Sequence, residues 1–184
     1  IRYTQWKTRM TTGSLALPFP TDVHTFVLPG AGGGMGITIM ERKDILDFKA
    51  LLGVLFQIPE EEEWSEEHPL ATPVQTLADA SDPAAYAPYW GTNGSFRPAA
   101  NVMLTNGEHD EATPYRTAIT LALAAELPVT TPVVIPIPGY AILDLEPAVP
   151  PYEGNVVGGT TGFLQFTDDL AIADADTHYL VFHR

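Results

Sequence analysis

The sequence has no cysteine and little positive charge, and each of these shortages excludes a class of protein. Without cysteine the chain can form neither disulfides nor zinc sites with thiolate ligands. Its 184 residues include 9 Lys and Arg against 23 Asp and Glu, which gives a net charge of −14. Nucleic acids and anionic membrane surfaces bind clustered basic residues, so we expect neither as a partner. No apolar run reaches the length of a membrane span, so we expect none.

The chain also lacks N-terminal signals and a catalytic motif. Its start, IRYTQWKTR, has neither an initiator Met nor the pattern of a signal peptide, and we expect a processed, trimmed or incomplete chain. No Gly-x-Ser-x-Gly occurs, so the usual elbow for a serine nucleophile is missing. The compartment stays open, because acidic composition and absent cysteine suit a secreted protein as well as others.

What is present predicts one globular domain over residues 1–184, since 45% of the residues are hydrophobic and 17% are charged. Apolar residues between 45 and 56 recur near helical spacing and predict an amphipathic helix over 37–57. That helix either covers the core or belongs to a helical flap or cap at 37–70. The acidic run at 60–67 lacks the small residues and the Gly of a calcium loop, so we expect a solvated loop.

Apolar runs bounded by Gly and Pro predict a small, mostly parallel sheet that includes 23–28, 101–104 and 160–166. Helical patterns between them, the strongest at 115–127, favour a three-layer α/β architecture. Residues 133–137 resemble an edge strand. So small a sheet leaves apolar edges and faces uncovered, and we expect self-association or a partner chain.

The glycine-rich stretch AGGGMG at 31–36 is not a phosphate loop. It lacks the Gly-Lys-Ser/Thr ending, and it is not followed by the strand–helix unit of a dinucleotide site. We expect a tight turn at the carboxyl edge of the sheet, where α/β proteins place their ligands.

Two short segments carry the candidate chemistry. NVMLTNGEHDEATP at 101–114 places Asp110 after an apolar run, and ADADTHYLVFHR at 173–184 places His178 in an acidic loop. An acid followed by a histidine near the chain end is the order of an α/β-hydrolase triad. There the carboxylate fixes the imidazole tautomer, and the imidazole activates a hydroxyl. We predict that Asp110 and His178 lie within hydrogen-bond reach at the carboxyl edge of the sheet.

Both residues also have structural interpretations. Asp110 precedes a helix, where an acid satisfies backbone N–H groups, and a lone His such as His178 is often a surface or core residue. His109 and Glu111 flank Asp110, so we expect them at the surface. A metal-dependent hydrolase using His109, Asp110 and His178 is a weaker alternative, because no metal-ligand spacing supports it, and we expect neither metal nor cofactor.

The nucleophile is not identified. Ser14 follows Gly13 in a segment with the composition of a packed helix end, and Ser95 lies in a loop with Gly on one side only. Both are weak candidates.

The order of these segments resembles the C-terminal half of a bacterial α/β-hydrolase of the esterase/lipase family. TNGEHDEATPYRTAITLALA resembles the family's Gly-x-x-Asp, Pro and helix after its sixth core strand, and ADADTHYLVFH resembles its terminal His loop. MTTGSLALPFPTDVHTFVLPGAGGG resembles the segment downstream of the nucleophile elbow. The resemblance implies a carboxylic ester hydrolase with Asp110 as triad acid and His178 as base.

The chain departs from this family at its start. Only residues 1–9 precede the resemblance, and Trp6 and Lys7 stand where an elbow has glycines. A non-catalytic α/β-hydrolase-like domain used for binding or assembly is therefore the main alternative.

Overall fold

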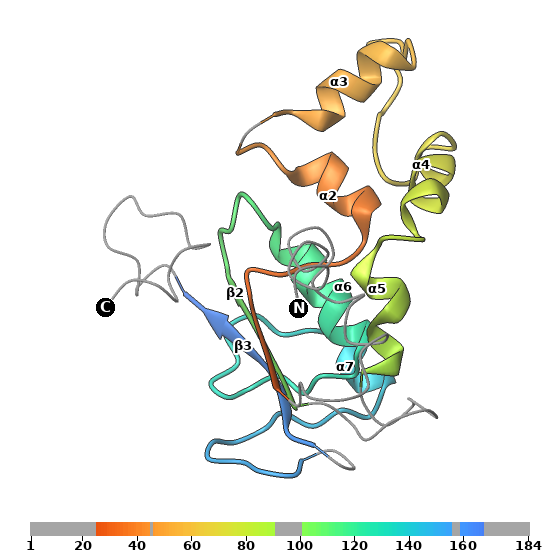
Figure 1. The fold of residues 1–184 in the computed structure, drawn as a ribbon. Helices are drawn as coiled ribbons and strands as arrows, with labels where there is room; N and C mark the ends of the chain where they lie inside the picture. Colours follow the sequence, from red (N-terminus) through yellow and green to blue (C-terminus); the bar gives the residue numbers. More distant parts are fainter. Residues whose placement is uncertain (1–24, 45, 91–100, 156–158, 168–184) are drawn as a thin grey trace, which may run out of the picture.

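Three parallel strands form the centre of the molecule in a computed structural model that describes residues 25–44, 46–90, 101–155 and 159–167 (Figure 1). The strands are β1 (Thr25–Pro29), β2 (Asn101–Gly107) and β3 (Thr161–Phe166), in the order β1-β2-β3. Both pairs are parallel. The predicted small parallel sheet is confirmed, and β2 runs three residues beyond the expected 101–104.

The chain segments that connect the strands form helices, and these helices flank the sheet (Figure 1). Between β1 and β2 lie α2 (Met35–Glu41), α3 (Phe48–Leu55), α4 (Ala71–Ala78), α5 (Pro83–Tyr86) and the 3-10 helix η2 (Ala87–Tyr89). Between β2 and β3 lie α6 (Tyr115–Ala124) and α7 (Gly139–Ile142). The class is therefore α/β. Within the described ranges no helix is both long and apolar enough to cross a bilayer.

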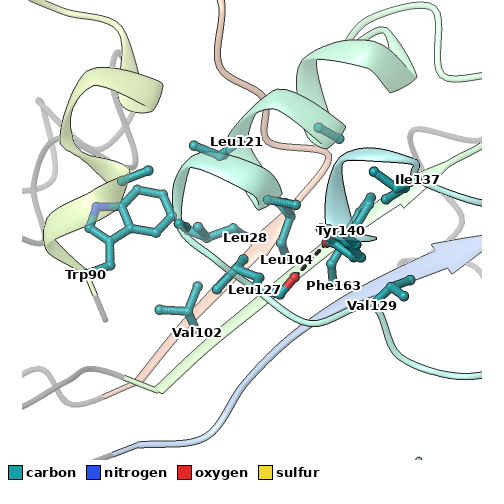
Figure 2. Packing of buried hydrophobic residues seen from close by; sticks show 14 residues of the cluster. Leu28, Trp90, Val102, Leu104, Leu121, Leu127, Val129, Ile137, Tyr140 and Phe163 are labelled. Atoms are coloured by element: carbon teal, nitrogen blue, oxygen red, sulfur yellow. Dashed lines mark hydrogen bonds between the residues drawn. The ribbon is translucent and has the colours of Figure 1, made fainter. Parts of the chain in front are cut away.

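The main core lies between α6 and one face of the sheet (Figure 2). The register places Leu28, Leu104 and Phe163 in one row across the strands, and all three are buried. Leu121 of α6 joins the same cluster. The hydroxyl of Tyr140 donates to the carbonyl of Leu127 at 2.6 Å, so the one polar atom of this buried ring is satisfied. Burial raises the pKa of Tyr140 and keeps the phenol neutral.

Helices α2 and α3 stand away from the strands, with α3 farthest out (Figure 1). They pack with α4 and the acidic loop around a second, smaller cluster of Met40, Trp64 and Ala71. The predicted single helix over 37–57 is wrong. The backbone is extended at Arg42, and the Asp47 side chain accepts from the N–H of Ala50 at 2.8 Å and starts a new helix. The charged residues 41–44 interrupt the apolar pattern, and the Asp47 cap begins a separate helix.

The expected edge strand at 133–137 is also wrong. The side-chain oxygen of Gln165 on β3 accepts from the N–H groups of Val134 and Ile135, at 2.8 and 3.1 Å. One amide side chain thus satisfies the donors that a strand ladder would have used. Just before this segment, two isolated β-bridges pair Val129 with Phe163 and Thr130 with Ala148.

Candidate functional site

Asp110 lies just past the carboxyl end of β2, the central strand, and before α6. Its side chain is 5% exposed. A carboxylate so placed requires hydrogen-bond donors, because burial without them would disfavour its charge strongly. The end of a central parallel strand is also where α/β proteins gather ligand-binding groups.

The described residues supply three such donors. Oδ1 of Asp110 accepts from the backbone N–H of Ala112 at 3.0 Å and of Thr113 at 2.6 Å. Oδ2 accepts from Nδ2 of Asn106 at 3.2 Å. Hydrogen bonds to both oxygens fix the plane of the carboxylate.

Asn106 is the residue that connects this carboxylate to the strand itself. It is buried on β2, and its amide nitrogen also donates to the carbonyl of Thr113 at 3.2 Å. Among the described residues, its side-chain oxygen has no hydrogen-bond partner. A buried acceptor without a partner is destabilising, typically by about 1–3 kcal/mol, and is uncommon in folded proteins.

Hydrogen bonds connect the turn that carries Asp110, and the start of α6, to the glycine-rich loop after β1. The hydroxyl of Thr113 donates to the carbonyl of Gly30 at 2.7 Å, and the N–H of Gly33 donates to the carbonyl of Thr117 at 2.9 Å. A Cβ on Gly32 would lie 2.7 Å from Cβ of Thr117, so only glycine allows this approach. The predicted tight turn at the carboxyl edge is confirmed, and Gly30 and Gly34 adopt positive φ within it.

Asp82 holds the other side of this loop. Its carboxylate accepts from the N–H of Gly34 at 2.9 Å and of Met35 at 2.7 Å, where α2 begins. It also accepts from the N–H of Ala84 at 2.9 Å and from Nε2 of Gln75 at 3.0 Å. Burial opposes ionisation of Asp82, but the bonds from Gln75 and the three backbone groups outweigh it and lower its pKa.

These bonds decide what the glycine-rich loop can do. The N–H groups of residues 33–35 are committed to Thr117 and Asp82, and that of Gly36 donates to Oε1 of Gln75 at 2.6 Å. They are therefore not open to cradle a phosphate or to stabilise an oxyanion, either of which needs N–H groups aimed at the ligand. These hydrogen bonds hold the loop in one conformation beside Asp110.

The remaining predicted site residues divide into two groups. His109 and Glu111 are exposed, as expected. His178, Ser14 and Ser95 lie outside the described residues, so the contact between Asp110 and His178 and the identity of the nucleophile stay predictions. Among the described residues no cluster of three or more His, Asp or Glu side chains could hold a metal ion.

Asp82 is the structural residue that the sequence did not reveal. Its one local signal is the Asp-Pro step, which begins α5 with Asp82 as the capping residue. Its contacts to Gly34 and Met35 join residues 48 and 47 positions apart, which no local pattern encodes.

The chain matches no protein-family model, no curated protein and no solved structure, so these comparisons assign neither a family nor a function.

Proposed function

We propose that this protein hydrolyses carboxylic esters and that Asp110 orients His178 in the reaction. The observation that carries the proposal is the buried Asp110 carboxylate, held by donors on both oxygens at the carboxyl end of the central parallel strand. The α/β sheet with its flanking helices is compatible with the three-layer architecture that the proposal requires.

In this mechanism the carboxylate accepts a hydrogen bond from one ring nitrogen of His178. That bond places the lone pair of the other nitrogen toward a hydroxyl nucleophile. The imidazole takes the hydroxyl proton as the oxygen attacks the ester carbonyl, and it then protonates the leaving alkoxide. Water repeats the sequence on the acyl intermediate. The nucleophile is supplied by a part of the chain outside the described residues or by another chain.

The test is hydrolysis of p-nitrophenyl butyrate by the 184-residue chain. We expect His178→Ala to remove nearly all activity, because base and nucleophile act as a unit. Asp110→Asn should lower kcat by roughly 10⁴-fold through the wrong tautomer. His109→Ala is the matched control, since this exposed neighbour should be neutral. A serine-directed phosphonate followed by peptide mass spectrometry locates the nucleophile, with Ser14 and Ser95 as the first candidates.

The proposal fails if activity survives His178→Ala, or if a chelator removes the activity and no residue is labelled. The second result would favour a metal-dependent hydrolase.

A non-catalytic binding or assembly domain is the second candidate. Two donors to Asp110 are backbone N–H groups of the turn that leads into α6, which is the bonding of a purely structural acid before a helix. Absence of both ester hydrolysis and phosphonate labelling, with the fold intact by circular dichroism, would favour this candidate.

A further inference from the structure

The helices that follow β1 have a small apolar core of their own. Met40, Trp64 and Ala71 are its buried members, and partly buried side chains of α2, of α3 and of the residues just after α3 pack against them. In the described part of the chain, no residue belongs to both this cluster and the main core. We call residues 35–78, which contain α2, α3 and α4, the outer unit. A unit that packs separately can move relative to the rest of a protein unless a large apolar interface prevents it.

The outer unit begins and ends at the same buried carboxylate. Asp82 accepts from the N–H groups of Gly34 and Met35, where α2 begins, and from Nε2 of Gln75 in α4. Gly34 has a φ of 82°, a left-handed conformation that permits the sharp change of direction into α2. Both chain connections between the outer unit and the rest of the protein therefore meet at Asp82, which is the arrangement expected of a hinge.

Arg116 connects the outer unit to α6 away from this hinge. Its two terminal nitrogens each lie 2.5 Å from a carboxylate oxygen, Nη1 from Oε1 of Glu41 and Nη2 from Oε1 of Glu66. Glu41 is the last residue of α2, at the opposite end of that helix from Gly34, and Glu66 belongs to the acidic loop. The side chain of Arg116 is 53% exposed, so salt can screen both ion pairs. Exposed ion pairs are weak, and these two can hold the unit in place and still release it.

The outer unit lies at the carboxyl edge of the sheet. It leaves the sheet through the glycine-rich loop, which follows the carboxyl end of β1. Arg116 is in the first turn of α6, which follows the carboxyl end of β2 through the turn that carries Asp110. Figure 1 shows α2 and α3 beyond these strand ends. The unit is therefore placed at the edge where α/β proteins bind their ligands.

We propose that the outer unit is a hinged cap, which turns about Gly34 and Asp82 and is held closed by the ion pairs of Arg116. Opening breaks these ion pairs, whereas the cluster around Trp64 moves with the cap and stays packed. Loss of Arg116 should raise the ratio of open to closed protein by about 3- to 10-fold, which is the effect expected of two exposed ion pairs. This motion does not depend on ester hydrolysis.

The test measures the distance between two spin labels by double electron–electron resonance. The sequence has no cysteine, so Val54→Cys on α3 and Ile142→Cys on α7 give two unique labelling sites, and both positions are exposed. At low salt we expect one main distance between the labels. Arg116→Gln, and separately Glu41→Gln with Glu66→Gln, should move part of the population to longer distances. Sodium chloride at about 1 M should do the same to the chain that keeps Arg116 and should add little to the Arg116→Gln variant.

Two controls separate opening of the cap from other effects. Lys43→Gln removes the same charge from an exposed position of the cap and should leave the distances unchanged. Labels at Val54 and Leu77, both exposed within the cap, should keep one distance in every variant, because the cap moves as one body. The proposal is overturned if neither Arg116→Gln nor salt changes the distances between Val54 and Ile142, or if Lys43→Gln changes them equally. A parallel change between Val54 and Leu77 would also overturn it, since that result means local unfolding and not a hinge motion.

Discussion

Replacing Asp82 by alanine should destabilise the protein more than any other single acidic substitution in the described ranges. The side chain is 1% exposed and accepts from four donors, the N–H groups of Gly34, Met35 and Ala84 and the amide of Gln75. Each buried donor left without a partner costs about 1–3 kcal/mol. Water can enter and satisfy part of the set, so we expect a loss of about 3–4 kcal/mol in the free energy of unfolding.

Asp82→Asn gives an intermediate result by the same reasoning. The amide keeps one acceptor oxygen, but its NH₂ group then faces a backbone donor. We expect a loss of about 2 kcal/mol, smaller than for alanine because part of the hydrogen bonding survives. Asp79→Asn is the matched control. Asp79 is exposed and accepts from Gln75 at 2.6 Å, and its substitution should change stability by less than about 0.5 kcal/mol.

The assay is equilibrium unfolding in urea, followed by tryptophan fluorescence and by far-UV circular dichroism. Trp64 lies in the small cluster and Trp90 in the main core, so the fluorescence reports on both. Hydrogen exchange at the amides of Gly34 and Met35 gives the local reading, and both should lose protection in Asp82→Ala. Equal stability of Asp82→Ala and Asp79→Asn would refute the assignment of Asp82 as the brace of the glycine-rich loop.

Three further predictions concern the pH dependence of stability, the glycine-rich loop and the main core. The pKa of Asp82 is lowered by folding from its ordinary value of 3.8, so the ionised carboxylate stabilises the folded state at pH values above about 4. In urea unfolding at a series of pH values, the difference in unfolding free energy between the wild type and Asp82→Asn should therefore narrow as the pH falls below about 4. Gly32→Ala should lower stability by about 2 kcal/mol or more in thermal melts, because its Cβ would overlap Thr117, whereas Gly53→Ala in α3 meets only an ordinary contact and should be neutral or stabilising. Phe163→Ala should cost about 3–5 kcal/mol in urea unfolding, since the side chain is fully buried in the central row of the core, while Val27→Ala, on the opposite face and 60% exposed, should cost less than about 1 kcal/mol.

The strands could be predicted because each is a short apolar run next to Gly or Pro: β1 ends at Pro29, β2 ends at Gly107, and β3 follows the glycines at 158–159. Leu28, Leu104 and Phe163 are the residues that make these runs visible, and they also form the central row of the core. The sequence does not predict the end of β2, because Thr105 and Asn106 are polar. Thr105 pairs with both β1 and β3 and Asn106 pairs with β3, and composition alone does not encode this pairing.

The helical segment after β1 shows what periodicity cannot specify. Apolar residues recur near helical spacing from Ile45 to Phe56, and the predicted single helix extends that pattern back across the charged residues 41–44 to Ile37. The chain ends α2 and restarts at the Asp47 cap, because two short helices can each turn an apolar side toward Trp64. Tertiary packing of this kind commonly outweighs local propensity.

The candidate site was predictable in position but not in construction. A carboxylate after an apolar run and before a Pro-opened helix placed Asp110 at the strand end, where the structure has it. The donors could not be predicted, since Asn106 contributes through its side chain and Thr113 through its backbone.

The hydrogen bonds around Asp110 help to decide whether this residue is catalytic or purely structural. A purely structural acid before α6 needs only the turn bonds from Ala112 and Thr113. Here Asn106 fixes the second oxygen from the strand, and the Thr113 hydroxyl fastens the turn to the loop after β1. A catalytic carboxylate requires such support, because its orientation must be held within a few tenths of an ångström. If Asp110 is catalytic, loosening the loop through Asp82→Asn should lower ester hydrolysis under conditions where the protein remains folded. If Asp110 only starts a helix, that substitution should change stability alone.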